Sequence, residues 1–232
     1  MKNGLIGDVN YYKNHETENI NIGHFEFAKE QVAIFKTYDI NLKMMHSVID
    51  KKGWIDGQAI DVYIANLIKD NDNITYLPTD MGGSILGRTE ESRWNKQMKI
   101  LSPSVNLGNL ILMPYVFFNH WRLLVIDTKN ESLELLDPYE HTGEKMERVQ
   151  EKLTDYFKHC QKNFSMKKLE NVQWAITSSL KNRPYQNDDA SCGAYVTYYM
   201  ECILKNENFE QEFDPEKYRL HIAEEILKIP NV

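Results

Sequence analysis

The chain has 232 residues, which is long enough to bury one sizeable core, and its 42% hydrophobic and 26% charged residues exclude a disordered polypeptide. Its formal net charge of −7 argues against nucleic acid or an anionic membrane as the main partner, because phosphate groups bind to basic surfaces. No secretory signal and no apolar run of membrane-spanning length is visible. The cysteines at 160, 192 and 202 show neither zinc spacing nor a disulfide framework. We therefore expect a monomer in a reducing compartment, the cytoplasm or the nucleus.

The N-terminal part of the chain divides into a polar segment and the start of a folded domain. Residues 1–30 are polar and without periodicity, which predicts an N-terminal extension. Residues 31–232 contain no internal repeat and no linker-like stretch, so we expect a single domain there. Within it, residues 56–70 carry apolar side chains at helical spacing and predict an amphipathic helix.

Residues 71–107 look loop-rich, with a short helix expected around residues 94–100. The pair Gly82-Gly83 lies in this stretch, but the Gly-Lys-Ser/Thr of a phosphate-binding loop does not follow it. The pair therefore predicts a turn.

The middle of the chain is rich in short apolar runs typical of β-strands. Such runs occupy residues 109–118, 121–128 and 132–139, and only a few turn residues separate each from the next. They predict consecutive, adjacent strands of one sheet. Residues 172–180 predict a further strand.

Three helices are predicted in the C-terminal half. Residues 144–163 form a charged amphipathic pattern, and residues 192–206 and 214–229 predict two more helices. The last one begins with Asp214 as N-cap and Pro215 at the first helical position. Helices at both ends with strands between them indicate an α+β domain with a central mixed sheet.

Cys192 is the cysteine best placed for chemistry. It follows the polar residues 187–189 and opens a helix, where unpaired backbone N–H groups stabilise a thiolate. Gly193 would let a substrate backbone approach closely. Taken alone, a cysteine before a helix is more often a buried structural residue, as we expect for Cys202 on the apolar face of the same helix, and Cys160 has no orienting acid nearby.

His120 and Asp137 supply a candidate base and the acid that orients it. His120 lies between two apolar β-rich runs, and Asp137 follows it by 17 residues, at the end of the next strand. In a tight antiparallel pair this spacing brings the two residues together, and the carboxylate would then fix the imidazole tautomer. Each residue separately also has a structural interpretation, a histidine at a strand edge and an Asp-Pro turn.

The segments "NHWRLLVID", "LELLDPYE" and "QNDDASCGAYV", in this order, resemble the ubiquitin-like-protein proteases. This family, also called SUMO- or sentrin-specific proteases, belongs to the adenain-like clan of cysteine peptidases. Its pattern includes a His-Trp pair that opens a strand, an Asp that ends the next strand, and a Gln six residues before Cys-Gly, which is Gln186 here. The resemblance extends over about residues 38–228.

The resemblance implies a catalytic role for four residues. His120 is the base, Asp137 its orienting acid and Cys192 the nucleophile, while Gln186 donates its side-chain amide to the oxyanion. The order His, Asp, Cys differs from the Cys, His, Asn order of papain, so a papain-like geometry with rearranged connectivity is expected.

The resemblance also assigns Trp54 and Trp121 to a narrow channel for a Gly-Gly tail, and the alternative for each is that it fills the core. The sequence departs from the family at Trp-Ile-Asp-Gly, residues 54–57, where the family has Trp-Leu-Asn-Asp. Ser191 stands where an Asp often precedes the nucleophile. These departures concern the recognised modifier and leave the triad intact.

The expected reaction is hydrolysis of a peptide or isopeptide bond after the Gly-Gly terminus of a ubiquitin-like modifier, without a metal or an organic cofactor. SUMO is the first expected partner, and ubiquitin or another modifier is the alternative. Acetyl transfer by a clan-related enzyme requires a basic site for acetyl-CoA, which this acidic chain does not show. A module that only binds a modifier remains a third interpretation, although all four catalytic positions carry competent residues.

Overall fold

The structure is a computed structural model that describes residues 21–26, 37–68, 71, 73–86, 108–140, 146–164, 172–177 and 182–229. Its centre is a mixed sheet in the order β3-β4-β5-β6-β7. The strands are β3 (Ile74–Tyr76), β4 (Leu110–Phe117), β5 (His120–Asp127), β6 (Ser132–Leu136) and β7 (Ala175–Ile176). Strand β5 is antiparallel to both β4 and β6. At the two edges of the sheet, β3 is parallel to β4 and β7 is parallel to β6. The three consecutive strands predicted from the sequence are thus confirmed. Of the strand predicted over 172–180, the structure describes residues 172–177, and among these Ala175 and Ile176 form β7.

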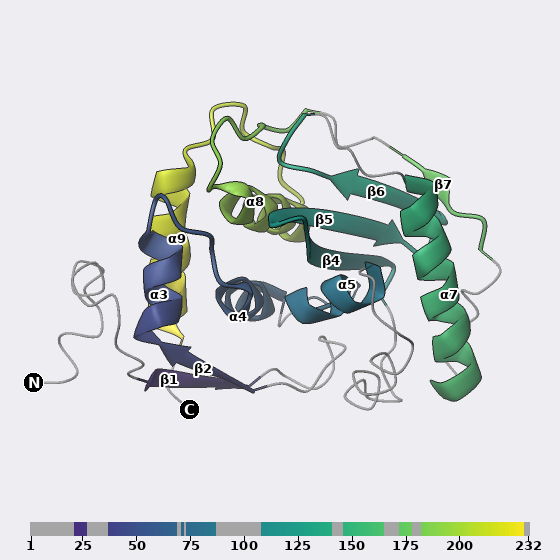
Figure 1. The fold of residues 1–232 in the computed structure, drawn as a ribbon, viewed down its shortest axis with the longest axis horizontal. Coiled ribbons are helices and arrows are strands. Elements are labelled where there is room, and N and C mark those ends of the chain that lie inside the picture. The colour runs from purple at the N-terminus through teal and green to yellow at the C-terminus, as the bar shows by residue number, and fades with distance from the viewer. Residues whose placement is uncertain are drawn as a thin grey trace, which may run out of the picture.

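One face of the sheet is covered by helices α4 (Gly57–Ile68) and α8 (Cys192–Lys205), and α3 (Leu42–Ile49) and α9 (Pro215–Lys228) pack outside them (Figure 1). Trp121, Leu123 and Val125 of β5 alternate towards this face and are buried there. The predicted helices at 56–70, 192–206 and 214–229 are confirmed. Asp214 caps α9 as expected, because its side chain accepts two backbone N–H groups of the first turn.

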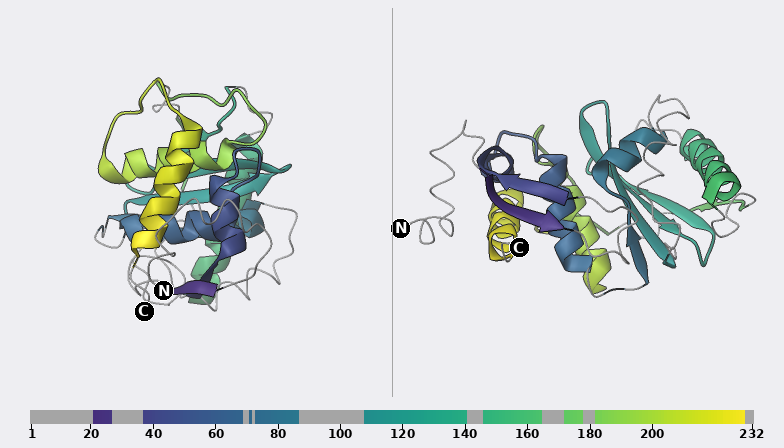
Figure 2. Two further views of the ribbon diagram at one scale, coloured as in Figure 1. Left: turned by 90° about the vertical axis from the view of Figure 1, so that its left-hand side faces the viewer. Right: turned by 90° about the horizontal axis from the view of Figure 1, so that it is seen from below.

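The opposite face is covered by α5 (Thr79–Leu86) and α7 (Met146–Phe164) (Figure 2, right). Leu124 and Ile126 of β5 point to this side and are fully buried. From α7, the side chains of Val149, Leu153 and Phe157 are buried against them, as the helical spacing in the sequence predicts. With helices on both faces of a mixed sheet, the domain has the expected α+β architecture.

The turn predicted at Gly82-Gly83 is wrong, because both glycines lie inside helix α5. A Cβ at Gly82 would lie 2.4 Å from the Pro114 carbonyl oxygen of β4, closer than atoms can pack. Glycine therefore lets α5 lie directly on the sheet. A Cβ added at Gly83 would meet no atom within 4 Å. The stretch read as loop-rich also contains β3, while the short helix expected around residues 94–100 lies outside the described residues.

A small antiparallel pair, β1 (Asn21–Glu26) and β2 (Thr37–Asn41), precedes α3 and forms a second sheet. Neither of these strands was predicted from the sequence, nor was α3. β1 lies inside the predicted extension, residues 1–30, and pairs with β2 beyond it. The chain passes from β2 directly into α3, where the Asn41 side chain accepts the Met44 N–H at 2.8 Å.

Candidate active site

The beginning of β5 and the end of β6 bring His120 and Asp137 together. β5 begins at His120, and Asp137 directly follows β6, the antiparallel neighbour of β5. His120 Nε2 lies 2.7 Å from Asp137 Oδ1, and the same oxygen accepts the Tyr139 backbone N–H at 2.9 Å. The proximity predicted from the 17-residue spacing is therefore confirmed.

Arg122, which is absent from the residues predicted from the sequence, also holds Asp137. It lies two residues after His120 on β5, so both side chains leave the same face of the strand. Arg122 Nε donates to Asp137 Oδ2 at 2.6 Å, and its guanidinium lies 5.0 Å from the centre of the Phe117 ring. Both charged side chains are buried. In the sequence, the signal for this contact is an arginine two residues after the histidine in a predicted strand, which places both side chains on the same face.

The charges around His120 favour its protonated form. Burial raises the pKa of Asp137, but the hydrogen bond with His120, the Arg122 charge and the Tyr139 N–H outweigh this and hold it below its usual value. Burial lowers the pKa of His120, but the interactions with Asp137 and with Cys192 raise it to about 9. The Tyr139 ring stacks on the imidazole with 4.5 Å between centroids. At neutral pH the site therefore holds an imidazolium beside the Cys192 sulfur.

Cys192 is the first residue of helix α8 and only 2% of its surface is exposed. The preceding loop is shaped by Asp188, whose Oδ1 accepts the backbone N–H groups of Ala190 and Ser191 at 2.7 Å each. The position in the first helical turn that the sequence predicts is confirmed. Cys192 therefore lies at the N-terminal, positive end of the α8 dipole.

Gln186 lies on the same loop, six residues before Cys192. Its backbone N–H donates to Pro138 O at 2.8 Å, which joins this loop to the turn that carries Asp137. Its side-chain Nε2 donates to Asp188 O at 2.6 Å, while Oε1 is buried and has no hydrogen-bond partner among the described residues. The structure thus gathers His120, Asp137, Gln186 and Cys192 into one region, and their catalytic roles stay predictions.

Arg219 of α9 fixes the loops on either side of this region, and it too was missed from the sequence. Its side chain is only 1% exposed. The two terminal nitrogens donate at 2.8–3.2 Å to five backbone carbonyls, those of Ser47, Val48, Asp50, Gly53 and Ala190. Through these hydrogen bonds Arg219 joins the segment before Trp54 to the loop before Cys192. An arginine at a core-facing helix position is the signal that would have found it.

The two tryptophans flank the start of α8 differently. Trp54 is 52% exposed and its Nε1 donates to Asp189 O at 3.4 Å, whereas Trp121 is buried with Nε1 3.3 Å from Ile55 O. A Cβ at Gly193 would lie 3.1 Å from Ile55 Cβ and 3.2 Å from Trp121 Cδ1. The close packing of Ile55 and Trp121 around this position thus favours glycine at residue 193, and the contact of Gly193 with substrate stays a prediction.

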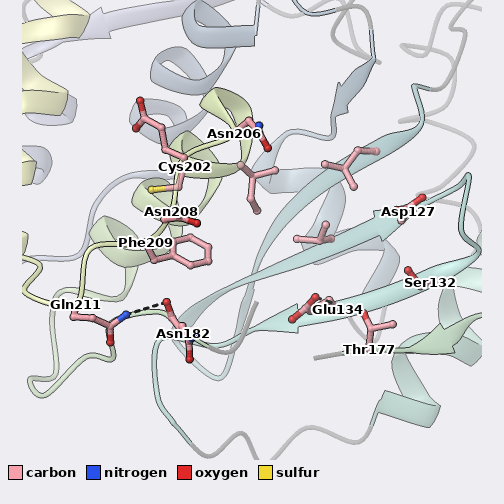
Figure 3. A pocket seen from close by; sticks show the side chains of 14 residues that line it. Asp127, Ser132, Glu134, Thr177, Asn182, Cys202, Asn206, Asn208, Phe209 and Gln211 are labelled. Atoms are coloured by element: carbon pink, nitrogen blue, oxygen red, sulfur yellow. Dashed lines mark hydrogen bonds between the residues drawn. The ribbon is translucent and has the colours of Figure 1, made fainter. Parts of the chain in front are cut away.

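A separate pocket of about 670 Å³ lies near the C-terminal end of α8 (Figure 3). Cys202, Asn206 and Phe209 form one wall, and Asp127 and Glu134 of the sheet contribute to the other. None of the four candidate catalytic residues is among its described lining residues. Burial raises the pKa of the Cys202 thiol to about 11, so this cysteine stays protonated and unreactive at neutral pH.

No group of three or more His, Cys, Asp or Glu side chains in the described ranges is placed to hold a metal ion. No helix among the described elements is long and apolar enough to cross a membrane. The side chain of Cys160 lies outside the described residues.

Comparison with known proteins gives one consistent family. The model of the Ulp1 protease family, C-terminal catalytic domain, matches residues 87–231. Human sentrin-specific protease 5 is 23% identical over 186 residues, covering 78% of this chain and 23% of that protein. Human sentrin-specific protease 2 is 25% identical over 156 residues, covering 66% and 26%. The chain thus spans about a quarter of the length of these curated relatives.

Solved structures show the same fold. The C-terminal Ulp1 protease domain in complex with Smt3, the yeast ortholog of SUMO, superimposes with a TM-score of 0.63 at 18% identity, covering 94% of this chain and 93% of that one. The SUMO protease Ulp1 with its catalytic cysteine oxidized to a sulfenic acid gives a TM-score of 0.65 at 17% identity, covering 98% and 95%.

Proposed function

This chain belongs to the Ulp1 protease family, and we propose that it is a cysteine protease that hydrolyses peptide or isopeptide bonds after the C-terminal Gly-Gly of a ubiquitin-like modifier. One observation carries the proposal. His120 and Asp137 are hydrogen-bonded at 2.7 Å, and the pKa of His120 is raised in part by the thiol of Cys192, the first residue of a buried helix. This arrangement supplies a nucleophile, a proton-transfer group and its orienting acid.

We assign the steps as follows. The Cys192 sulfur attacks the carbonyl carbon of the terminal glycine, and the imidazolium of His120 gives its proton to the leaving amine as the C–N bond breaks. Water, deprotonated by the now neutral His120, then attacks the thioester and releases the modifier with a free carboxylate. Asp137 keeps the imidazole oriented throughout, through Nε2, so that Nδ1 faces the sulfur.

The oxyanion of the tetrahedral intermediate receives hydrogen bonds from the Cys192 backbone N–H and from Gln186. The Gln186 Nε2 donates to the Asp188 carbonyl in the structure, with Asp188 Oδ1 at 3.3 Å. We propose that the oxyanion takes over one of these N–H groups when substrate binds. Loss of such a donor typically lowers kcat by about 10²–10³.

We place the Gly-Gly tail beside Trp54 and Trp121, where flat aromatic walls admit only residues without side chains. SUMO is the first modifier to test, since the similar Ulp1 domain was solved in complex with Smt3. Ubiquitin is the second. We further propose residues 31–232 as the catalytic domain with residues 1–30 as an extension, in a reducing compartment that keeps Cys192 as a free thiol.

The test uses modifiers that carry a cysteine-reactive group in place of the terminal carboxylate. The protein is incubated with such probes of SUMO and ubiquitin, and any adduct is mapped by mass spectrometry. We expect an adduct on Cys192 that is abolished by Cys192→Ala and slowed by orders of magnitude by His120→Ala.

Cys202→Ala is the matched control, because its buried thiol has a raised pKa and is not expected to react. Labelling should therefore persist in that variant. An adduct on Cys202 or Cys160, or no adduct with any modifier, would contradict the proposed function.

A further inference from the structure

The turn that precedes His120 places a bulky residue in a backbone conformation that suits glycine or asparagine. Phe117 pairs with His120 across the β4–β5 hairpin, so Phe118 and Asn119 are its two turn residues. Their φ angles are 50° and 59°. A two-residue hairpin turn with positive φ at both positions favours Asn and Gly, and a large aromatic side chain there is an outlier. Asn119 fits the turn, whereas Phe118 does not.

The strain in the Phe118 backbone is not offset by burial of its side chain. The Phe118 side chain is 80% exposed, and its ring meets the Phe117 ring edge-on with 4.5 Å between centroids. Fold stability would be served better by a small polar residue at this position. A strained residue that packs against little protein is the kind of feature that is retained for binding.

The position of Phe118 relative to the chemistry indicates what it binds. The leaving amine must contact His120, because the imidazolium gives it a proton in the proposed reaction. Phe118 is two residues from His120 in the same turn. Val116, a second exposed apolar residue of this hairpin at 42% exposure, lies opposite Trp121 on β4.

We propose that Phe118 is a specificity-determining residue that contacts the leaving group, namely an apolar side chain close to the modified lysine of the conjugated protein. The inference rests on the proposed function and adds to it a binding site for the second product. Phe118 acts in binding alone and takes no part in the proton transfers. Its contact exists only for substrates in which a polypeptide follows the scissile bond.

The experiment compares two substrates of the modifier that labels Cys192, SUMO or ubiquitin. One is the modifier joined to aminomethylcoumarin, whose leaving group has no polypeptide. The other is the modifier joined through its terminal glycine to a lysine of a folded protein. Phe118→Asn is measured on both, and Asn119→Gly is the matched control, because it relaxes the same turn and keeps the aromatic ring.

We expect Phe118→Asn to raise Tm by roughly 2–4 °C through relief of the turn. It should lower kcat/KM about tenfold for the protein conjugate, mainly through KM, and leave the coumarin substrate unchanged. Asn119→Gly should keep kcat/KM for both substrates. An equal loss on both substrates, or no loss on the conjugate, would overturn the inference while the proposed function stands. Failure of the unmodified protein to cleave either substrate would overturn the proposed function and this inference with it.

Discussion

Replacing Arg122 by methionine removes the cation that holds Asp137 Oδ2 and keeps much of the buried volume. The Nε–Oδ2 distance is 2.6 Å, and the two side chains are only 9% and 3% exposed. Removing one partner of such a buried pair costs roughly 3–5 kcal/mol, because the other charge is left without compensation. Asp137 keeps His120 and the Tyr139 N–H as partners, so we expect a loss of about 3 kcal/mol, the lower end of that range.

The same change has a second consequence, on pH dependence. Asp137 has a folded-state pKa below its unfolded value, so it contributes stability above its unfolded pKa of about 3.9 and loses it as pH falls through the folded pKa. Without the Arg122 charge the folded pKa of Asp137 rises towards its unfolded value, so Asp137 contributes less stability at pH 7 and the loss of that contribution is complete at a higher pH. The unbalanced carboxylate also raises the pKa of His120, which moves the alkaline limb of kcat/KM upward.

The measurements are urea unfolding at pH 7 and pH 4.5, and kcat/KM against pH with a modifier–aminomethylcoumarin substrate. Arg122→Met/Asp137→Asn completes a double-mutant cycle, and its stability loss should be smaller than the sum of the two single losses. A loss below about 1 kcal/mol in Arg122→Met, as for an exposed ion pair, together with an unmoved pH profile, would refute the reasoning.

Three further predictions follow from the same contacts. Arg219→Met should lower the free energy of unfolding by at least about 3 kcal/mol, because five backbone carbonyls lose a buried donor. Urea titration measures this change, and a loss below about 1 kcal/mol would contradict a stabilising role for these hydrogen bonds. Gly82→Ala should cost roughly 1–3 kcal/mol because its Cβ meets a β4 carbonyl, whereas Gly83→Ala, which faces open space, should be neutral or stabilising in thermal unfolding; equal effects would count against the close packing. The kcat/KM of the parent protein should fall above about pH 9 as His120 loses its proton, and Asp137→Asn should move this limb to lower pH; a limb that stays in place would exclude Asp137 as its cause.

The sequence by itself determined the features that depend on neighbours along the chain. Strands β4 to β6 follow from short β-rich apolar runs between turns, and the 17-residue interval then places Asp137 beside His120, because hairpin pairing fixes register over such distances. The start of α8 at Cys192 follows from polar, turn-forming residues before a helical apolar pattern. The sequence therefore marks His120, Asp137 and Cys192 as candidates, while the role of Gln186 follows from the family resemblance.

The tertiary structure alone decided what depends on partners far away in the chain. From the sequence alone Gly82 favours a turn, because only the folded structure shows that the β4 backbone occupies the space of a Cβ at this position. The edge strand β3 has three residues, which are too few to carry a periodic signal. Arg219 donates to carbonyls up to 172 residues away, which no local pattern encodes. Neighbouring side chains decided the electrostatics as well, because Cys192 and Cys202 are both buried, at 2% and 3% exposure, and Cys192 differs in lying beside His120.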